Sequence, residues 1–209
     1  MNRQELGRKF ARVTTNAVVA RPRLWRLFRR LMRRQFETLA PHWDQIRTAG
    51  HLAPYERALD ALPAPPARAL DVGTGTGDGA LAIARRFPQA EVIGVDLADA
   101  MLTEARRKLP AELAGRVRFE SADASSLPYA DGTFDLVAHA NMIPFFDEVA
   151  RLVAPGGHAL FAFSAGAETP IYVSIERLRT ELQRRGFAEF AEITAGDGTG
   201  LLARKATGS

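Results

Sequence analysis

A glycine-rich turn after an apolar strand carries the clearest chemical signal in this sequence. The run is Ala69-Leu70-Asp71-Val72-Gly73-Thr74-Gly75-Thr76-Gly77. Glycines at alternate positions let the backbone turn sharply and approach a ligand, and a following helix directs unpaired N–H groups at an anion. Asp71 adds a carboxylate that can meet an ammonium group. The segment predicts a site for a nucleotide-like ligand with a zwitterionic part; the alternative is a strand-to-helix turn without a ligand.

The spacing of these glycines argues against a dinucleotide. The dinucleotide-binding fingerprint requires glycine at its first, third and sixth positions. Counting from Gly73, the third position is Gly75, but the sixth is Asp78. An NAD-dependent oxidoreductase is therefore disfavoured.

Two further predicted strands also end on an acid. The first runs from Ala90 to Asp96 and the second from Val117 to Asp123. Carboxyl ends of parallel strands meet at one edge of a sheet, where ligands bind. Asp96 can accept hydrogen bonds from both hydroxyls of a ribose. An acid at this place also suits an NAD site, or the N-cap of the segment after Leu97.

In this order, the motifs resemble those of class I S-adenosylmethionine-dependent methyltransferases, most closely the small-molecule, quinone-biosynthesis-like group. The segment from Asp71 to Gly77 is similar to motif I of that family. The turn Arg151–Gly157 before the predicted strand 158–163 is similar to the turn before the family's fifth strand. The resemblance spans residues 36–205 and implies S-adenosyl-L-methionine as the cofactor.

The resemblance also implies which residues contact the cofactor. They are Asp71, Gly73, Thr74, Gly75, Gly77, Asp96, Leu97, Met101, Asp123, Ala124, Asn141 and Trp43. The methionine half would lie over the glycine loop with Asn141 nearby, and Asp123 would hydrogen-bond the adenine amino group. Leu97 and Met101 would pack against the adenine ring. The Trp43 indole would cover the sulfonium or the substrate, since its face attracts cations, or would equally anchor a capping helix.

The catalytic residue is left unknown, because a sulfonium methyl is already electrophilic and in-line transfer mainly requires positioning. The weak candidates for a base are His139, His42 and Glu168. The chain has no cysteine, and its four histidines show no metal-ligand spacing, so no metal site is predicted.

Alternating strands and helices predict an α/β fold: a Rossmann-like, doubly wound, seven-stranded, mostly parallel sheet with an antiparallel C-terminal hairpin and an N-terminal helical cap. The predicted strands are 67–73, 90–96, 117–123, 134–140, 158–164, 187–195 and 199–205. The predicted helices are 52–62, 77–87, 98–108, 145–153 and 171–186. We expect a basic cap or extension over residues 1–50 and the methyltransferase domain over 51–209.

The basic charge lies in the N-terminal part. Residues 1–47 hold twelve of the 28 Lys and Arg and three of the 24 Asp and Glu, a net charge of +9 in a chain of +4 overall. Residues 21–36 predict an amphipathic helix with arginines between apolar positions 24, 25, 28, 31, 32 and 36. Three interpretations stay open: a solvated helix packed over the cofactor cleft, a peripheral contact with an anionic membrane, or nucleic-acid binding.

Together these features predict methyl transfer from S-adenosylmethionine to a small, apolar acceptor in the cytoplasm, with possible contact of residues 21–36 with a membrane. No run of about 18 apolar residues predicts a membrane span. One alternative is a noncatalytic cofactor-fold module that acts through the arginine-rich helix. Another is a nucleic-acid methyltransferase, although Asn141-Met142-Ile143-Pro144-Phe145 has one residue too many for the Asn-Pro-Pro signature of amine methylation. The sequence does not specify the acceptor or the oligomeric state.

Overall fold

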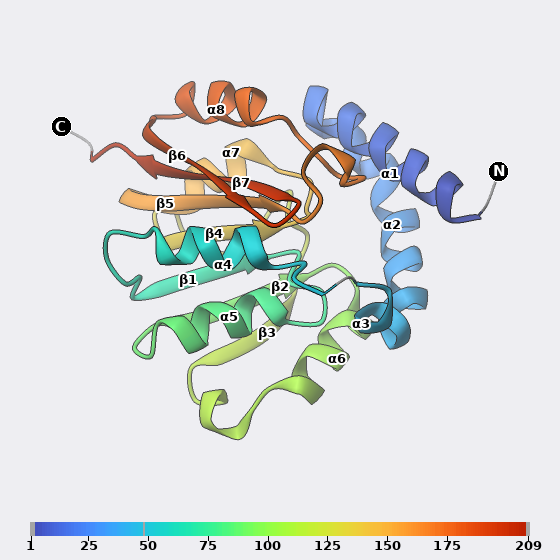
Figure 1. Ribbon diagram of the computed structural model, residues 1–209, viewed down its shortest axis with the longest axis horizontal. Helices are drawn as coiled ribbons and strands as arrows, with labels where there is room; N and C mark the ends of the chain where they lie inside the picture. The colour runs from blue at the N-terminus through green and yellow to red at the C-terminus, as the bar shows by residue number, and fades with distance from the viewer. Residues whose placement is uncertain (1–2, 48, 208–209) are drawn as a thin grey trace.

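A seven-stranded sheet in the order β3-β2-β1-β4-β5-β7-β6 organises the computed structural model, which describes residues 3–47 and 49–207 (Figure 1). The strands are β1 (Arg68–Val72), β2 (Glu91–Asp96), β3 (Val117–Ser121), β4 (Phe134–Ala140), β5 (Val153–Phe163), β6 (Phe187–Ala195) and β7 (Gly198–Lys205). The α-helices are α1 (Arg3–Ala20), α2 (Trp25–Leu39), α3 (Trp43–Ile46), α4 (Ala53–Asp60), α5 (Asp78–Arg86), α6 (Asp99–Lys108), α7 (Phe146–Leu152) and α8 (Ile175–Gln183). Short 3₁₀ turns include η1 (Pro22–Leu24), η2 (Ala40–His42) and η4 (Gly166–Glu168).

Strand pairing confirms the predicted fold class. The strands β1 to β5 pair in parallel, and β7 is antiparallel to both β5 and β6. The chain adds β2 and β3 on one side of β1 and then continues with β4 on the other side. This reversal makes the carboxyl ends of β1 and β4 the switch point of the sheet, where open α/β sheets bind their ligands.

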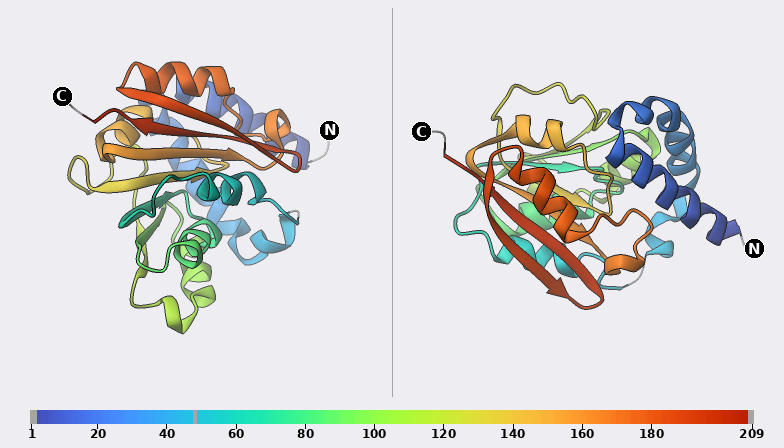
Figure 2. Two further views of the ribbon diagram at one scale, coloured as in Figure 1. Left: turned by 60° about the vertical axis from the view of Figure 1, so that its left-hand side comes forward. Right: turned by 90° about the horizontal axis from the view of Figure 1, so that it is seen from above.

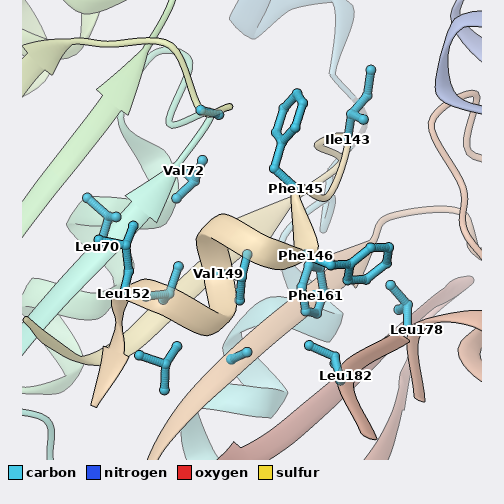
Figure 3. Packing of buried hydrophobic residues seen from close by; sticks show 14 of the residues in the cluster. Leu70, Val72, Ile143, Phe145, Phe146, Val149, Leu152, Phe161, Leu178 and Leu182 are labelled. Atoms are coloured by element: carbon cyan, nitrogen blue, oxygen red, sulfur yellow. The ribbon is translucent and has the colours of Figure 1, made fainter. Parts of the chain in front are cut away.

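Alternating side chains fill two apolar layers, one on each face of the sheet. Leu70 and Val72 of β1 pack on the same side as α7 and α8, together with Phe161 (Figure 3). Ala69 and Leu160 contribute to the opposite layer, which α4, α5 and α6 cover. Figure 2 shows the helices on both sides of the twisted sheet. Both faces are covered, as a largely parallel sheet requires.

Several predicted element boundaries are wrong, and three of them are informative. The strand β5 begins at Val153 and not at residue 158, because it pairs with Phe134 through a register shift that absorbs the predicted turn. Helix α8 begins at Ile175 and not at 171, because the Ser174 side chain accepts a hydrogen bond from Arg177 N–H and caps it. The strand β3 ends at Ser121, so Asp123 lies two residues beyond it.

The amphipathic segment forms α2, which lies at the end of the sheet beside α6 (Figure 1). Trp25 and Met32 are buried, which confirms the interpretation that an apolar stripe packs this helix against the domain. The assignment of Leu31 to that stripe is wrong: its side chain is 53% exposed, on the same side as Leu27. Among the described residues, no helix has the length and apolarity to cross a bilayer.

Candidate functional site

The glycine loop after β1 has the backbone geometry that its sequence predicts. Gly73, Gly75 and Gly77 have φ values of 69°, 54° and 90°, in the left-handed region that a Cβ atom disfavours. Thr74 N–H donates to the Val95 carbonyl at 2.9 Å, which ties the loop to β2. Gly77 then precedes the first turn of α5. The loop therefore places the N-terminus of α5 at the switch point.

Asp71 lies beneath this loop and not on its open side. Its carboxylate is 2% exposed and accepts hydrogen bonds from the Tyr55 hydroxyl at 2.8 Å and the Thr74 hydroxyl at 2.6 Å. A Cβ atom on Gly79 would lie 2.6 Å from Oδ2. Burial raises the pKa of Asp71 to about 6, although these hydrogen bonds oppose the shift. The carboxylate thus supports the loop through Thr74, and its contact with a ligand ammonium stays a prediction.

Asp96 faces the loop from the end of β2. Its Oδ2 accepts from Gly75 N–H at 2.9 Å and its Oδ1 from Ala98 N–H at 2.9 Å. Burial raises its pKa, against the effect of these backbone N–H groups. The N-cap role considered for Asp96 belongs to Glu37 of α2, whose carboxylate accepts from Asp99 and Ala100 N–H at the start of α6. Leu97 N–H is a third backbone donor to this carboxylate, which leaves one of its four lone pairs for a further donor.

Asp123 is held by α2. The Trp25 indole N–H donates to its Oδ1 at 2.7 Å, and Ser125 donates to the same oxygen through N–H at 3.0 Å and Oγ at 2.8 Å. Arg29 lies 3.3 Å from Oδ2. Burial alone would raise the pKa of Asp123, but these hydrogen bonds lower it. Ala124 beside it is buried.

Asn141 directly follows β4, across the switch point from the glycine loop. Its φ of 52° is the one positive value of a non-glycine residue in the described part of the chain, and its Oδ1 accepts from Ser164 N–H at 2.9 Å. The next residue, Met142, covers the loop: a Cβ atom on Gly73 would lie 2.7 Å from its Sδ. Sequence reasoning assigned no role to Met142, although its place directly after Asn141 at a strand end was a signal.

Trp43 reaches the same loop from α3. A Cβ atom on Gly75 would lie 3.6 Å from the Trp43 Nε1, and the indole packs edge-on against Phe36 with centroids 5.4 Å apart. Met101 is 1% exposed, in a small cluster against which Phe36 and Trp43 pack. Leu97 is half-buried against the larger cluster that contains Trp25. The structure thus places Trp43, Leu97 and Met101 near one edge of the sheet, and their contact with the cofactor stays a prediction.

A polar network that the sequence did not predict fastens this N-terminal segment to the loop. Lys108 of α6 contacts Asp44 at 2.9 Å and Asp78 at 2.5 Å, and Arg47 contacts Asp78 at 2.7 Å. Thr76 of the loop donates to Asp44 at 2.7 Å. Burial would raise the pKa of Asp44, but hydrogen bonds from Lys108, Thr76 and Arg47 lower it far below its usual value. Asp78, which stands where the dinucleotide fingerprint requires glycine, therefore forms ion pairs with Lys108 and Arg47.

The three candidate bases are not brought together. His139 lies on β4, is 2% exposed and stacks on Phe161 with centroids 4.6 Å apart; burial lowers its pKa to about 4, so it is neutral at pH 7. His42 and Glu168 are exposed, on η2 and η4. In the described part of the chain, no hydrogen bond or ion pair joins any two of them. No group of three or more metal-ligating side chains gathers among the described residues.

The doubly wound sheet, the glycine loop at its switch point and acids after β2 and β3 define the Rossmann-like architecture of class I S-adenosylmethionine-dependent methyltransferases. Residues 69–157 match the family model described as a methyltransferase domain. Residues 69–157 are therefore identified as a methyltransferase domain.

Curated relatives carry methyltransferase names. A demethylmenaquinone methyltransferase of Thermus thermophilus is 44% identical over 135 residues, which cover 58% of this chain and 60% of that protein. A malonyl-[acyl-carrier protein] O-methyltransferase of Halorhodospira halophila is 36% identical over 68% of this chain and 50% of that protein. The chain thus spans about half the length of these relatives.

Solved structures share the fold at low sequence identity. A methyltransferase from Aquifex aeolicus described as SAM-dependent has a TM-score of 0.63 at 17% identity and covers 78% of this chain and 96% of its own. Phosphoethanolamine N-methyltransferase 2 of Haemonchus contortus, solved in complex with S-adenosyl-L-methionine, has a TM-score of 0.56 at 24% identity and covers 72% of this chain and 38% of its own. These likenesses concern the fold.

Proposed function

We propose that this chain binds S-adenosylmethionine at the carboxyl edge of its sheet and transfers the methyl group to a small apolar acceptor. The observation that carries the proposal is the left-handed glycine loop whose Gly75 N–H is fixed by Asp96. A ribose hydroxyl needs a hydrogen-bond acceptor, and the Asp96 carboxylate retains a lone pair beside its three backbone donors. The N-terminus of α5 and the loop glycines provide the close backbone approach that the methionine half needs.

The cofactor supplies an electrophilic methyl group, so the chain has to orient the acceptor and exclude water. Trp43 and Met142 cover the loop and provide apolar walls. The segment after β5 faces the same edge, where α1 holds it: Arg12 donates to the carbonyls of Ala167 at 2.7 Å and Thr169 at 3.0 Å. The proposal assigns no general base. His139 is a weak base, because burial lowers its pKa to about 4, and its ring is stacked on Phe161. The other two candidates, His42 and Glu168, are exposed.

The acceptor class follows from these apolar walls and from the names of the relatives. Phe163 and Tyr172 pack edge-on, with centroids 5.1 Å apart, where β5 meets the segment that α1 holds. Demethylmenaquinone methyltransferase and the ubiquinone/menaquinone C-methyltransferases are among the relatives. An apolar aromatic acceptor of the quinol type is therefore the first to test.

The outward face of α2 supports contact with an anionic lipid surface. Leu27 is 72% exposed and Leu31 53%, one turn apart on the helix. Arg26, Arg30 and Arg34 are also exposed, and none has a carboxylate partner among the described residues. Apolar side chains between unpaired guanidinium groups suit the boundary between acyl chains and anionic headgroups. An apolar acceptor dissolved in a bilayer would be reached from this side.

Calorimetric titration with S-adenosylmethionine, S-adenosylhomocysteine and NAD tests the cofactor. We expect both sulfur compounds to bind and NAD not to bind. Asp96→Ala should weaken binding about tenfold or more, since a charge-assisted hydrogen bond contributes roughly 1.5 to 3 kcal/mol. Asp147→Ala, which removes an exposed partner of Arg185 far along the chain, is the matched control. Failure of both sulfur compounds to bind at millimolar concentration contradicts the proposal.

Co-sedimentation with vesicles tests the lipid contact. Wild type should bind vesicles that contain phosphatidylglycerol and not vesicles of phosphatidylcholine alone, and binding should fall with salt. Changing Leu27 and Leu31 to Ser should abolish it. Val13→Ser removes an equally exposed apolar side chain from α1 and should leave binding unchanged. Binding that the leucine changes do not affect would exclude α2 as the membrane-facing element.

A further inference from the structure

The side chain that holds Asp123 comes from the same chain. The resemblance gives this carboxylate to the adenine amino group of the cofactor, but here Trp25 donates to Oδ1 at 2.7 Å. Oδ1 already accepts two donors from Ser125, and Arg29 lies 3.3 Å from Oδ2. Carboxylate oxygens have two lone pairs each, so Oδ1 is saturated. Oδ2 keeps one lone pair beside Arg29, whereas an incoming amino group can bind Oδ1 only by displacing Trp25 or Ser125.

The indole also fills the space beside this carboxylate. Trp25 is 5% exposed and packs edge-on against Phe145, with centroids 5.5 Å apart. Its cluster includes Met32 from the same face of α2, with Leu97 and Met142 packed against it. Leu97 is the residue expected to contact the adenine ring. A flat aromatic ring with one N–H donor aimed at Asp123 therefore makes the hydrogen bond expected of the adenine amino group.

Further polar contacts of α2 hold the indole in this place. Arg33 pairs with Asp99 at 2.6 Å, and Glu37 accepts N–H groups from Asp99 and Ala100 at the start of α6. The short turn η1 separates α2 from α1, so the two helices are not one continuous rod (Figure 1). Helix α2 can leave the sheet edge by a change at η1 while α1 stays on the segment after β5.

We propose that Trp25 sets the affinity for the cofactor by occupying the adenine end of its site, so that the cofactor binds only when the start of α2 is released. The proposal rests on the proposed function, because it needs S-adenosylmethionine as the ligand. The population of the released state then multiplies the intrinsic affinity, as in any site whose competent state is a minor one. Trp25 is thus an internal competitor, and its removal should tighten binding.

Titration of S-adenosylhomocysteine into Trp25→Phe tests this directly. Phenylalanine keeps an aromatic ring in the cluster and loses only the N–H donor and part of the volume. We expect the Kd to fall about tenfold or more, the change set by losing one hydrogen bond to a carboxylate. Trp25→Ala should lower it further if that variant stays folded. Leu27→Ala, on the opposite face of the same helix, should leave the Kd unchanged.

Hydrogen exchange gives a readout of opposite sign for the two possible roles of Trp25. If the cofactor displaces it, saturating S-adenosylhomocysteine should lower the protection of amides 25–32 in wild type. Weaker binding by Trp25→Phe, or increased protection of α2 with ligand, would mean that Trp25 forms a wall of the adenine pocket, and either result overturns the proposal. Absence of binding in both wild type and Trp25→Phe would instead contradict the proposed function itself.

Discussion

The buried pair Tyr55–Asp71 gives a pH-dependent prediction that needs no ligand. Asp71 has a folded pKa of about 6, raised from 3.8 by burial. Between these values the folded state holds a proton that the unfolded state has lost, so the stability that Asp71 contributes is complete below about pH 4 and is lost as pH rises through about 6. Two pKa units correspond to roughly 3 kcal/mol.

The perturbation is Tyr55→Phe. Tyr55 is fully buried and donates to Asp71 Oδ1 at 2.8 Å. Above pH 6 it stabilises an ionised carboxylate, a bond that contributes about 1.5 to 3 kcal/mol; below pH 4.5 the carboxyl is neutral and the bond contributes about 0.5 to 1.5 kcal/mol. The loss of unfolding free energy should therefore be larger at pH 7.5 than at pH 4.5, by about 1 kcal/mol.

Urea unfolding at pH 4.5, 6.0 and 7.5 measures this difference. The control is Tyr172→Phe, a tyrosine that packs on Phe163 and shows no side-chain hydrogen bond within the described ranges. It should lose a similar small amount of stability at all three pH values. Equal destabilisation by Tyr55→Phe at pH 4.5 and 7.5 would refute the argument, because the hydroxyl would then not distinguish the ionised from the neutral form of Asp71.

Three further perturbations follow from the same edge of the sheet. Gly79→Ala places a Cβ atom 2.6 Å from Asp71 Oδ2 and should cost about 1 to 3 kcal/mol in urea unfolding, whereas Gly115→Ala, with nothing within 4 Å, should change stability by less than about 0.5 kcal/mol. Asn141→Ala should lower stability by about 1 to 2 kcal/mol more than Asn141→Gly in thermal unfolding, because only glycine accepts a φ of 52° without a Cβ penalty; equal losses would contradict this. Lys108→Met removes a hydrogen bond that lowers the pKa of Asp44. Asp44 stabilises the folded state above pH 3.8, and this contribution is lost as the pH falls. The loss of unfolding free energy in acid should therefore be less steep in the variant than in wild type.

Local sequence patterns predicted the sheet and the glycine loop at its carboxyl edge. The strands β1, β2 and β4 and the helices α5 and α6 begin and end within two residues of their predicted places. Buried parallel strands have apolar runs that end at acids or glycines, and these signals are contiguous in the chain. The glycines of the loop were likewise recognisable, because positive φ at alternate positions is a backbone requirement that few other residues meet.

Contacts that join distant parts of the chain were not predictable in the same way. Glu37 accepts from the start of α6 across 62 positions, and Trp25 donates to Asp123 across 98. A helical period of 3.6 identifies which side of α2 is apolar but not which strand end it faces. The error at Leu31 has the same origin: it lies about 120° around the helix from Trp25, so only the packing of α2 could decide its exposure.

Three aspartates at or just beyond neighbouring strand ends show why residue type and position did not settle their roles. Asp71 receives two hydroxyl groups in a closed core, Asp96 receives backbone N–H groups and keeps one open lone pair, and Asp123 receives an indole and a guanidinium from α2. Burial raises the pKa of the first two, while the donors of Asp123 outweigh burial and lower its pKa. The number and charge of the donors, not the acid itself, therefore give these three carboxylates different surroundings, so the ribose role proposed for Asp96 does not transfer to the other two.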